Sequence, residues 1–238
     1  MSRPASPKLF QLVFVELARD IVSGRVSPGE ELQSEQLLAE RFEVSKPVVR
    51  AAIQDLESCG LIRVRHGKRS VTTPSREWDL LDESVQEAYR LEGLASELVE
   101  SLFELRGIFE PPVAALAADR ATAEDLAEIE RLVEQMERSI AGGDPVASFL
   151  LDDRDFHAAI ALASKNHLVV ATLRALRNVV TTSWTASPVE VGDLGTLLLQ
   201  HREICDAISR HDGAAASEAM SRHLRWARLR DLKLSTTM

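Results

Sequence analysis

Apolar side chains recur at three- and four-residue spacing through most of the chain after residue 90, which is the spacing of one face of an α-helix. The stretches with this spacing are 94–118, 126–140, 149–163, 168–184, 194–208 and 214–232. The residues between them that can cap or break helices are Thr122 with Asp125, the 142–145 segment, Asn166 and Asp212. No stretch after residue 75 alternates as a strand would. The pattern therefore predicts an all-α bundle of six or seven helices over residues 76–238.

The first 75 residues show a different pattern, in which two short helical stretches precede a hairpin. A turn at 43–45 joins the helical stretches, and Ser34 and Ser45 stand where N-caps are expected. The residues expected on the buried faces are Leu37, Leu38 and Phe42, then Val48, Ala52, Ile53 and Leu56. Gly60 would end the second helix, and 61–64 would pair with 70–73. The fold class is thus mainly α, with a winged helix-turn-helix of three helices and a β-hairpin wing over 1–75, ending at the polar segment 72–75.

Cations gather where a winged helix would meet double-stranded DNA. Lys46 and Arg50 are the only charges on the exposed start of the second helix, and such a helix suits insertion into the major groove. Ser45 could donate at the start of that helix, and Gly67 permits close approach to the DNA backbone. The expected DNA-binding residues are Ser45, Lys46, Arg50, Arg63, Arg65, His66, Gly67 and Lys68.

The net charge of −9 is divided unevenly along the chain. Residues 1–75 contain 11 Lys and Arg against 9 Asp and Glu, whereas residues 76–238 contain 17 against 28. An acidic body discourages loose phosphate binding, while a basic face steers DNA to one surface. The charge pattern therefore favours a specific DNA site.

Targeting and membrane signals are missing from the sequence. No apolar run approaches the roughly 18 residues that a membrane span needs, and residues 1–7 do not form a signal peptide. The two cysteines, Cys59 and Cys205, stand in helical patterns that would bury their thiols. We therefore expect a cytoplasmic protein with no membrane partner.

The first 75 residues resemble the DNA-binding domain of the GntR family. The residues that carry this resemblance are 21–30, Leu32, Ser34-Glu35, Ser45-Lys46, Val49-Arg50 and 56–62. The later part resembles the FCD ligand-binding domain of the FadR-like branch. The matching residues there are Glu104-Leu105-Arg106, Phe109-Glu110, 153–157, Asn166, His201-Arg202 and 222–224. The resemblance implies a transcription repressor that binds a small organic acid and acts as a homodimer. One winged helix reads only a few base pairs, which also favours a symmetric dimer on an inverted-repeat operator.

Four residues of the helical part are candidate metal ligands. Asp153 and His157 are four residues apart, so both lie on one face of a helix. His201 and His223 stand on two further predicted helices, which a bundle core can bring together. Three imidazoles and one carboxylate suit zinc, with nickel, manganese or iron as alternatives. Spacing alone favours ordinary packing or surface histidines, because an Asp and a His four residues apart are a common pair. The resemblance carries all four positions over as ligands.

Arg106 and Asn166 are the candidate effector-binding residues. A guanidinium inside the bundle would bind a carboxylate through two parallel hydrogen bonds. The alternative for Arg106 is an ion pair with Glu110 on the same helix. The FCD resemblance favours the effector role for Arg106 and includes Asn166, which the pattern also marks as a helix cap.

The sequence thus predicts a transcription regulator controlled by a small carboxylate bound at a metal-containing site. One alternative is a metal sensor, in which the ion itself is the signal and a buried arginine has no role. Another is a metal-dependent hydrolase fused to a DNA-binding module, but no signature such as His-Glu-x-x-His is present. We therefore expect a protein that is not an enzyme.

Overall fold

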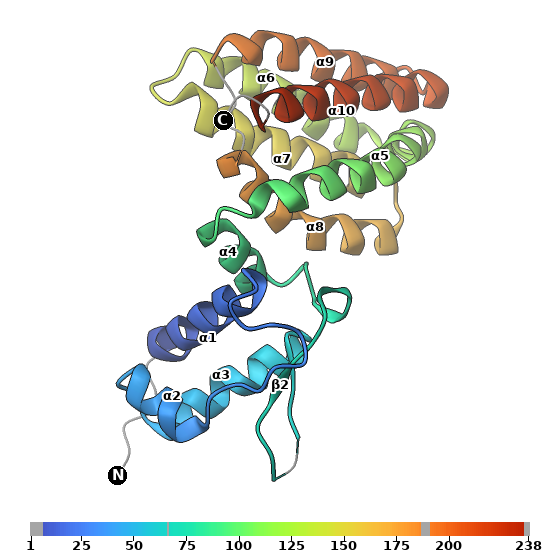
Figure 1. The fold of residues 1–238 in the computed structure, drawn as a ribbon. Coiled ribbons are helices and arrows are strands. Elements are labelled where there is room, and N and C mark those ends of the chain that lie inside the picture. The colour runs from blue at the N-terminus through green and yellow to red at the C-terminus, as the bar shows by residue number, and fades with distance from the viewer. Residues whose placement is uncertain (1–6, 66, 187–190, 236–238) are drawn as a thin grey trace. The chain divides into compact units, whose positions relative to one another are not determined.

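The computed structural model describes residues 7–65, 67–186 and 191–235, and the chain divides into two compact units between Ala95 and Ser96 (Figure 1). The first unit begins with α1 (Pro7–Val22), α2 (Glu35–Arg41) and α3 (Lys46–Ser58). Two short antiparallel strands follow, β1 (Ile62–Arg63) and β2 (Val71–Thr72), with Ile62 opposite Thr72. The predicted winged helix-turn-helix with three helices and a hairpin wing is confirmed.

The starts of α2 and α3 differ in how they are capped. The Ser34 hydroxyl accepts a hydrogen bond from the Leu37 backbone N–H, as predicted. Ser45 occupies the N-cap position of α3, but its side chain makes no capping hydrogen bond, so that part of the prediction is wrong. The reason is local, because Pro47 has no N–H and the Val48 N–H is bonded to the Ser45 carbonyl.

The buried face of α3 is the predicted one, with Val48, Ala52, Ile53 and Leu56 in the core. In α2, Leu38 is buried, but Leu37 is 50% exposed, contrary to expectation. A helix of only seven residues can direct few side chains inward, and Leu37 and Leu38 point about 100° apart around its axis.

The first unit continues past the polar 72–75 segment through a 3₁₀ turn, η1 (Ser75–Glu77), into α4 (Glu83–Leu91), a helix the sequence analysis did not predict. The Asp82 carboxylate caps α4 by accepting from the backbone N–H groups of Ser84 and Val85. The helix packs on α1 and buries Val85, Ala88 and Tyr89. Three buried apolar positions on a nine-residue helix form too short a pattern to stand out in the sequence.

Six helices form the described part of the second unit: α5 (Ala95–Arg120), α6 (Ala123–Ile140), α7 (Pro145–Ala163), α8 (His167–Ala186), α9 (Val191–Ser209) and α10 (Gly213–Ser235). They correspond to the six predicted stretches, and no strand is present among the residues described after position 75. The helices α6 and α7 pack together, and α9 lies beside α10 and against α6 (Figure 1).

Capping side chains set where these helices begin. Thr122 and Asp125 form a reciprocal capping box at α6, and the Asp144 carboxylate accepts from the Ala147 N–H at α7. Asn166 and Asp212 cap α8 and α10 in the same way, as the sequence predicted. The core between the helices contains fully buried Phe149, Phe156, Met136, Leu194 and Ile204. Over the residues searched, none of the helices combines the length and apolarity needed to cross a bilayer.

Gly60, just after α3, offers a test of the packing of the first unit. Its φ of +73° is in the left-handed region, and an added Cβ would lie 2.0 Å from the Glu77 carbonyl oxygen. Gly24 has a similar φ of +76° with nothing within 4 Å of an added Cβ. We expect Gly24→Ala to lower the free energy of unfolding by about 1 kcal/mol, and Gly60→Ala by at least about 3 kcal/mol, because a clash adds to the strain. Denaturant unfolding of the full chain measures both, and equal losses would exclude the close approach.

Candidate DNA interface and metal centre

The start of α3 exposes the predicted DNA-contacting cations. Lys46 is exposed, and the Arg50 side chain is 64% exposed. Arg50 Nε donates to Glu35 Oε2 on α2 at 2.7 Å, so this guanidinium has a protein partner in the absence of DNA. An exposed ion pair of this kind is weak, on the order of 0–1 kcal/mol, and a phosphate or base edge can replace it.

The wing carries the second group of predicted contacts. Arg65 and Lys68 are exposed, and Gly67 has a φ of +70° with open space around it. Arg63 donates to Glu77 Oε2 at 2.8 Å. A groove of about 590 Å³ separates the wing from the start of α2. His66 lies outside the described residues.

The four predicted metal ligands come together in the helical unit. Asp153 and His157 project from α7, His201 from α9 and His223 from α10. One donor atom from each lies within 4.8 Å of the others. Bonds of about 2.1 Å place opposite ligands of one ion roughly 4.2 Å apart, so the cluster is close to the size that a single ion needs. Asp153, His201 and His223 are buried, and the His157 side chain is only 11% exposed.

Two of the three histidines in this cluster have ring nitrogens that are not used up by hydrogen bonds. His201 Nε2 lies 2.9 Å and His157 Nε2 3.8 Å from the same oxygen, Asp153 Oδ1. In the part of the chain that is described, the buried nitrogens of His157 and His201 nevertheless have no correctly aligned hydrogen-bond partner. Unsatisfied nitrogens that converge beside a carboxylate fit the donor set of a divalent cation.

Burial and neighbouring charges put these groups in the protonation states that a metal requires. Burial lowers the pKa of His201, more than Asp153 raises it. Burial, together with His201 and His157, lowers the pKa of His223 well below its ordinary value. Burial alone raises the pKa of Asp153. The hydrogen bond from His201 and the other imidazoles lower it by more, so the net pKa lies well below the usual range. At neutral pH the site therefore presents an ionised Asp153 carboxylate and neutral imidazoles on His201 and His223.

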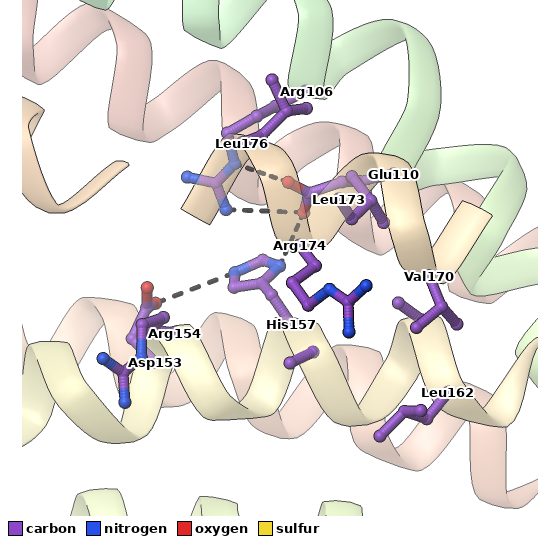
Figure 2. A pocket seen from close by; sticks show the side chains of 12 residues that line it. Arg106, Glu110, Asp153, Arg154, His157, Leu162, Val170, Leu173, Arg174 and Leu176 are labelled. Atoms are coloured by element: carbon purple, nitrogen blue, oxygen red, sulfur yellow. Dashed lines mark hydrogen bonds and ion pairs between the residues drawn. The ribbon is translucent and has the colours of Figure 1, made fainter. Parts of the chain in front are cut away.

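Two further side chains hold the histidine rings, in roles that no sequence pattern predicted. Glu110 Oε2 lies 2.6 Å from His157 Nδ1 (Figure 2), and His223 Nδ1 is 3.0 Å from Gln200 Oε1. Contacts at Nδ1 leave Nε2 of both rings for the centre of the cluster, as is usual for metal-binding histidines. Glu110 comes from another helix, so no spacing rule could pair it with His157. Gln200 is next to His201 in sequence but orients a ring on α10.

Arg106 forms the intrahelical ion pair that the sequence analysis gave as the alternative. Its Nε donates to Glu110 Oε1 at 2.5 Å, and both side chains are buried (Figure 2). Burial alone raises the pKa of Glu110, but Arg106 and His157 lower it by a larger amount. The net pKa is below its ordinary value, so Glu110 stays ionised. Asn166 accepts from the Leu168 and Val169 N–H groups and is not among the residues that line the neighbouring cavity.

A cavity of about 220 Å³ adjoins the cluster. Its polar end is formed by Asp153, His157, Glu110 and Arg106, and apolar side chains from α7 and α8 form its wall (Figure 2). A few convergent polar groups beside an apolar wall are typical of small-ligand sites.

Comparison with known proteins identifies both units. Residues 10–71 match the bacterial regulatory proteins of the gntR family, and residues 101–225 match the FCD domain. The chain is a member of the GntR family with an FCD domain. The galactonate operon transcriptional repressor of Escherichia coli K12 is 28% identical over 211 residues, which are 87% of this chain and 90% of that protein. The HTH-type transcriptional regulator LutR of Bacillus subtilis 168 is 31% identical over 217 residues, 86% and 92% of the two chains.

A solved structure supports the fold. The structure of Lar, described as controlling expression of the Listeria monocytogenes agr system, has a TM-score of 0.66, with 98% of this chain and 100% of that one covered. At 17% identity this likeness concerns the fold alone. The family and the named relatives show that this GntR-family protein is a DNA-binding transcription regulator and not an enzyme, so the hydrolase alternative is set aside.

The Arg106–Glu110 pair generates a stability prediction for the GntR-family protein. We expect Glu110→Gln to lower the free energy of unfolding of the metal-free chain by about 2–4 kcal/mol, because the buried ion pair with Arg106 is broken. Glu104→Gln on the same helix removes an exposed carboxylate that lies 3.2 Å from Arg228, and should cost less than about 1 kcal/mol. Thermal or denaturant unfolding compares the two, and a Glu110→Gln variant as stable as Glu104→Gln would contradict the buried pair.

Proposed function

We propose that this protein is a homodimeric repressor whose affinity for an inverted-repeat operator is set by a small carboxylate bound at a metal-containing site in the helical unit. The observation that carries the proposal is the convergence of Asp153, His157, His201 and His223 beside a cavity. The winged helix in the first unit supplies the DNA-binding output.

The donor set favours zinc as the resident ion, with nickel, manganese or iron as alternatives. A bound divalent ion would supply a Lewis-acidic centre that attracts a carboxylate oxygen. The protein contributes the preset rings, since Glu110 and Gln200 orient His157 and His223. Ligands from three helices also mean that the ion stabilises the fold of the unit.

Arg106 supports a carboxylate effector because it lines the same cavity as two of the candidate ligands, Asp153 and His157. Its guanidinium already bonds Glu110, so an effector carboxylate would share Arg106 with Glu110 or take its place. One relative is named for the galactonate operon, and galactonate is itself a sugar acid. An effector changes DNA affinity only to the extent that it binds one conformation of the regulator better than the other, typically by ~1–3 kcal/mol.

A metal sensor is the second candidate. It is favoured by the same Arg106–Glu110 ion pair, which satisfies the arginine without any effector. The two hypotheses differ in whether the cavity has a ligand other than the ion.

For the DNA interface, we expect Arg50→Ala to weaken specific operator binding by about 1–3 kcal/mol, because a base or phosphate contact from the recognition helix is lost. Lys68→Ala in the wing should instead weaken binding to all duplexes and lower the slope of log K against log salt by about 1. Fluorescence anisotropy with operator and random duplexes at several salt concentrations measures both. Arg138→Ala, an exposed arginine of α6, is the charge-matched control. Unchanged operator affinity in Arg50→Ala would remove this residue from the interface.

For the metal and effector, we expect purified chain to hold about one divalent ion, and carboxylates to raise its melting temperature and change its operator affinity. A ligand at a hundredfold excess over its Kd stabilises by about 2.7 kcal/mol. Both responses should disappear after chelation and in His201→Ala. They should persist in His167→Ala, which removes an exposed imidazole outside the cluster.

The outcomes separate the hypotheses. A metal-free protein that gains no stability from zinc, nickel, manganese or iron would falsify the metal site. If the metal alone changes DNA affinity and no carboxylate shifts the melting temperature, the protein is a metal sensor.

A further inference from the structure

Three arginines line the cavity, and they differ in whether they already have a counter-charge. Arg106 bonds Glu110, and Arg154 bonds Asp155 with both Nε and Nη2, at 3.0 and 2.9 Å from Oδ1. Arg174, on α8, has no carboxylate within ion-pair distance among the residues described. Figure 2 shows its guanidinium extending from α8 into the space occupied by the other lining side chains.

An exposed arginine on a helix is ordinarily just a solvated charge. Arg174 is exposed, but its side chain forms part of the cavity lining together with Val170 and Leu173 of the same helix. It is therefore the cationic group that a ligand entering the cavity meets without first displacing a protein carboxylate.

The groups around the metal-loaded cavity would carry an excess of positive charge. Asp153 and Glu110 contribute two negative charges, whereas a divalent ion, Arg106 and Arg174 contribute four positive charges. Arg154 is balanced by Asp155. A monocarboxylate would leave part of this excess uncompensated, and a dianion would neutralise it.

The shape of the cavity limits the rest of the ligand. Between the ligand cluster and α8 the wall is apolar, with Leu162, Val170 and Leu173 among its side chains. A volume of about 220 Å³ corresponds to roughly seven water-sized groups at ~30 Å³ each. This space suits two acidic groups separated by a short, largely hydrocarbon spacer.

We infer that Arg174 recognises a second anionic group of the effector, and that the effector is a short-chain dianion. One carboxylate is directed to the ion and Arg106, and the second group, a carboxylate or a phosphate, pairs with Arg174. This inference rests on the proposed function, because it requires a carboxylate at the metal-containing cavity.

The test is isothermal titration of metal-loaded full chain with malonate, succinate, glutarate and adipate. The matched monoanions are their half-amides, which keep the size of each diacid but lose one charge. An ω-phosphonate analogue of the best diacid distinguishes a distal phosphate from a distal carboxylate. The variants are Arg174→Gln and Arg174→Lys, with Arg138→Gln on α6 as the control of equal charge change.

We expect at least one diacid to bind the wild-type chain about three- to tenfold more tightly than its half-amide, the range of a charge-assisted contact that solvent partly screens. Arg174→Gln should reduce diacid affinity to that of the half-amide and leave half-amide binding unchanged. Arg174→Lys should restore part of the difference, and Arg138→Gln should behave as the wild type.

Three results would overturn the inference. If diacids and half-amides bind the wild type with equal affinity, the site does not recognise a second anionic group. If Arg174→Gln lowers the affinity for both ligand classes by the same factor, Arg174 attracts anions in general and does not bind the second group. In either case the metal-bound carboxylate and the proposed function stand. If neither class binds the metal-loaded chain, the proposed function fails and the role of Arg174 fails with it.

Discussion

The buried carboxylate of Glu110 is the group on which the geometry of the helical unit's site depends. One of its oxygens accepts from Arg106 and the other approaches His157, so a single side chain of α5 fixes both the cavity arginine and a candidate metal ligand on α7. A buried ionised group is tolerated only when opposite charges or hydrogen bonds compensate for its loss of hydration. Loss of Glu110 would remove both its ion pair with Arg106 and its orienting contact with His157.

The candidate metal site and its cavity draw side chains from most helices of the helical unit. The cluster joins α7, α9 and α10, Glu110 adds α5, and the cavity wall adds α8. Within the first unit, Glu92 lies just after α4 and is held by Arg19 and Arg25 at 2.6 and 2.7 Å. Since α3 also packs on α1, these ion pairs join the end of the first unit to the element that supports the recognition helix.

Much of the fold follows from the sequence, because helices are local structures. Their period, caps and breakers lie within a few residues of one another, so six helices of the second unit and the winged helix could be predicted. The failures are also local in origin. Pro47 removed the donor that Ser45 would cap, Leu37 shares a two-turn helix with Leu38, and α4 was too short for its period to be seen.

By itself the sequence determined the pairs that one helix turn brings together, Asp153 with His157 and Arg106 with Glu110, because residues four apart share a helix face. Only the tertiary structure decided that Glu110 meets His157, that Gln200 orients His223, and that Arg174 lines the cavity beside them. These contacts join different helices, and their distances depend on how side chains pack in the core between the helices, which no spacing along the chain records.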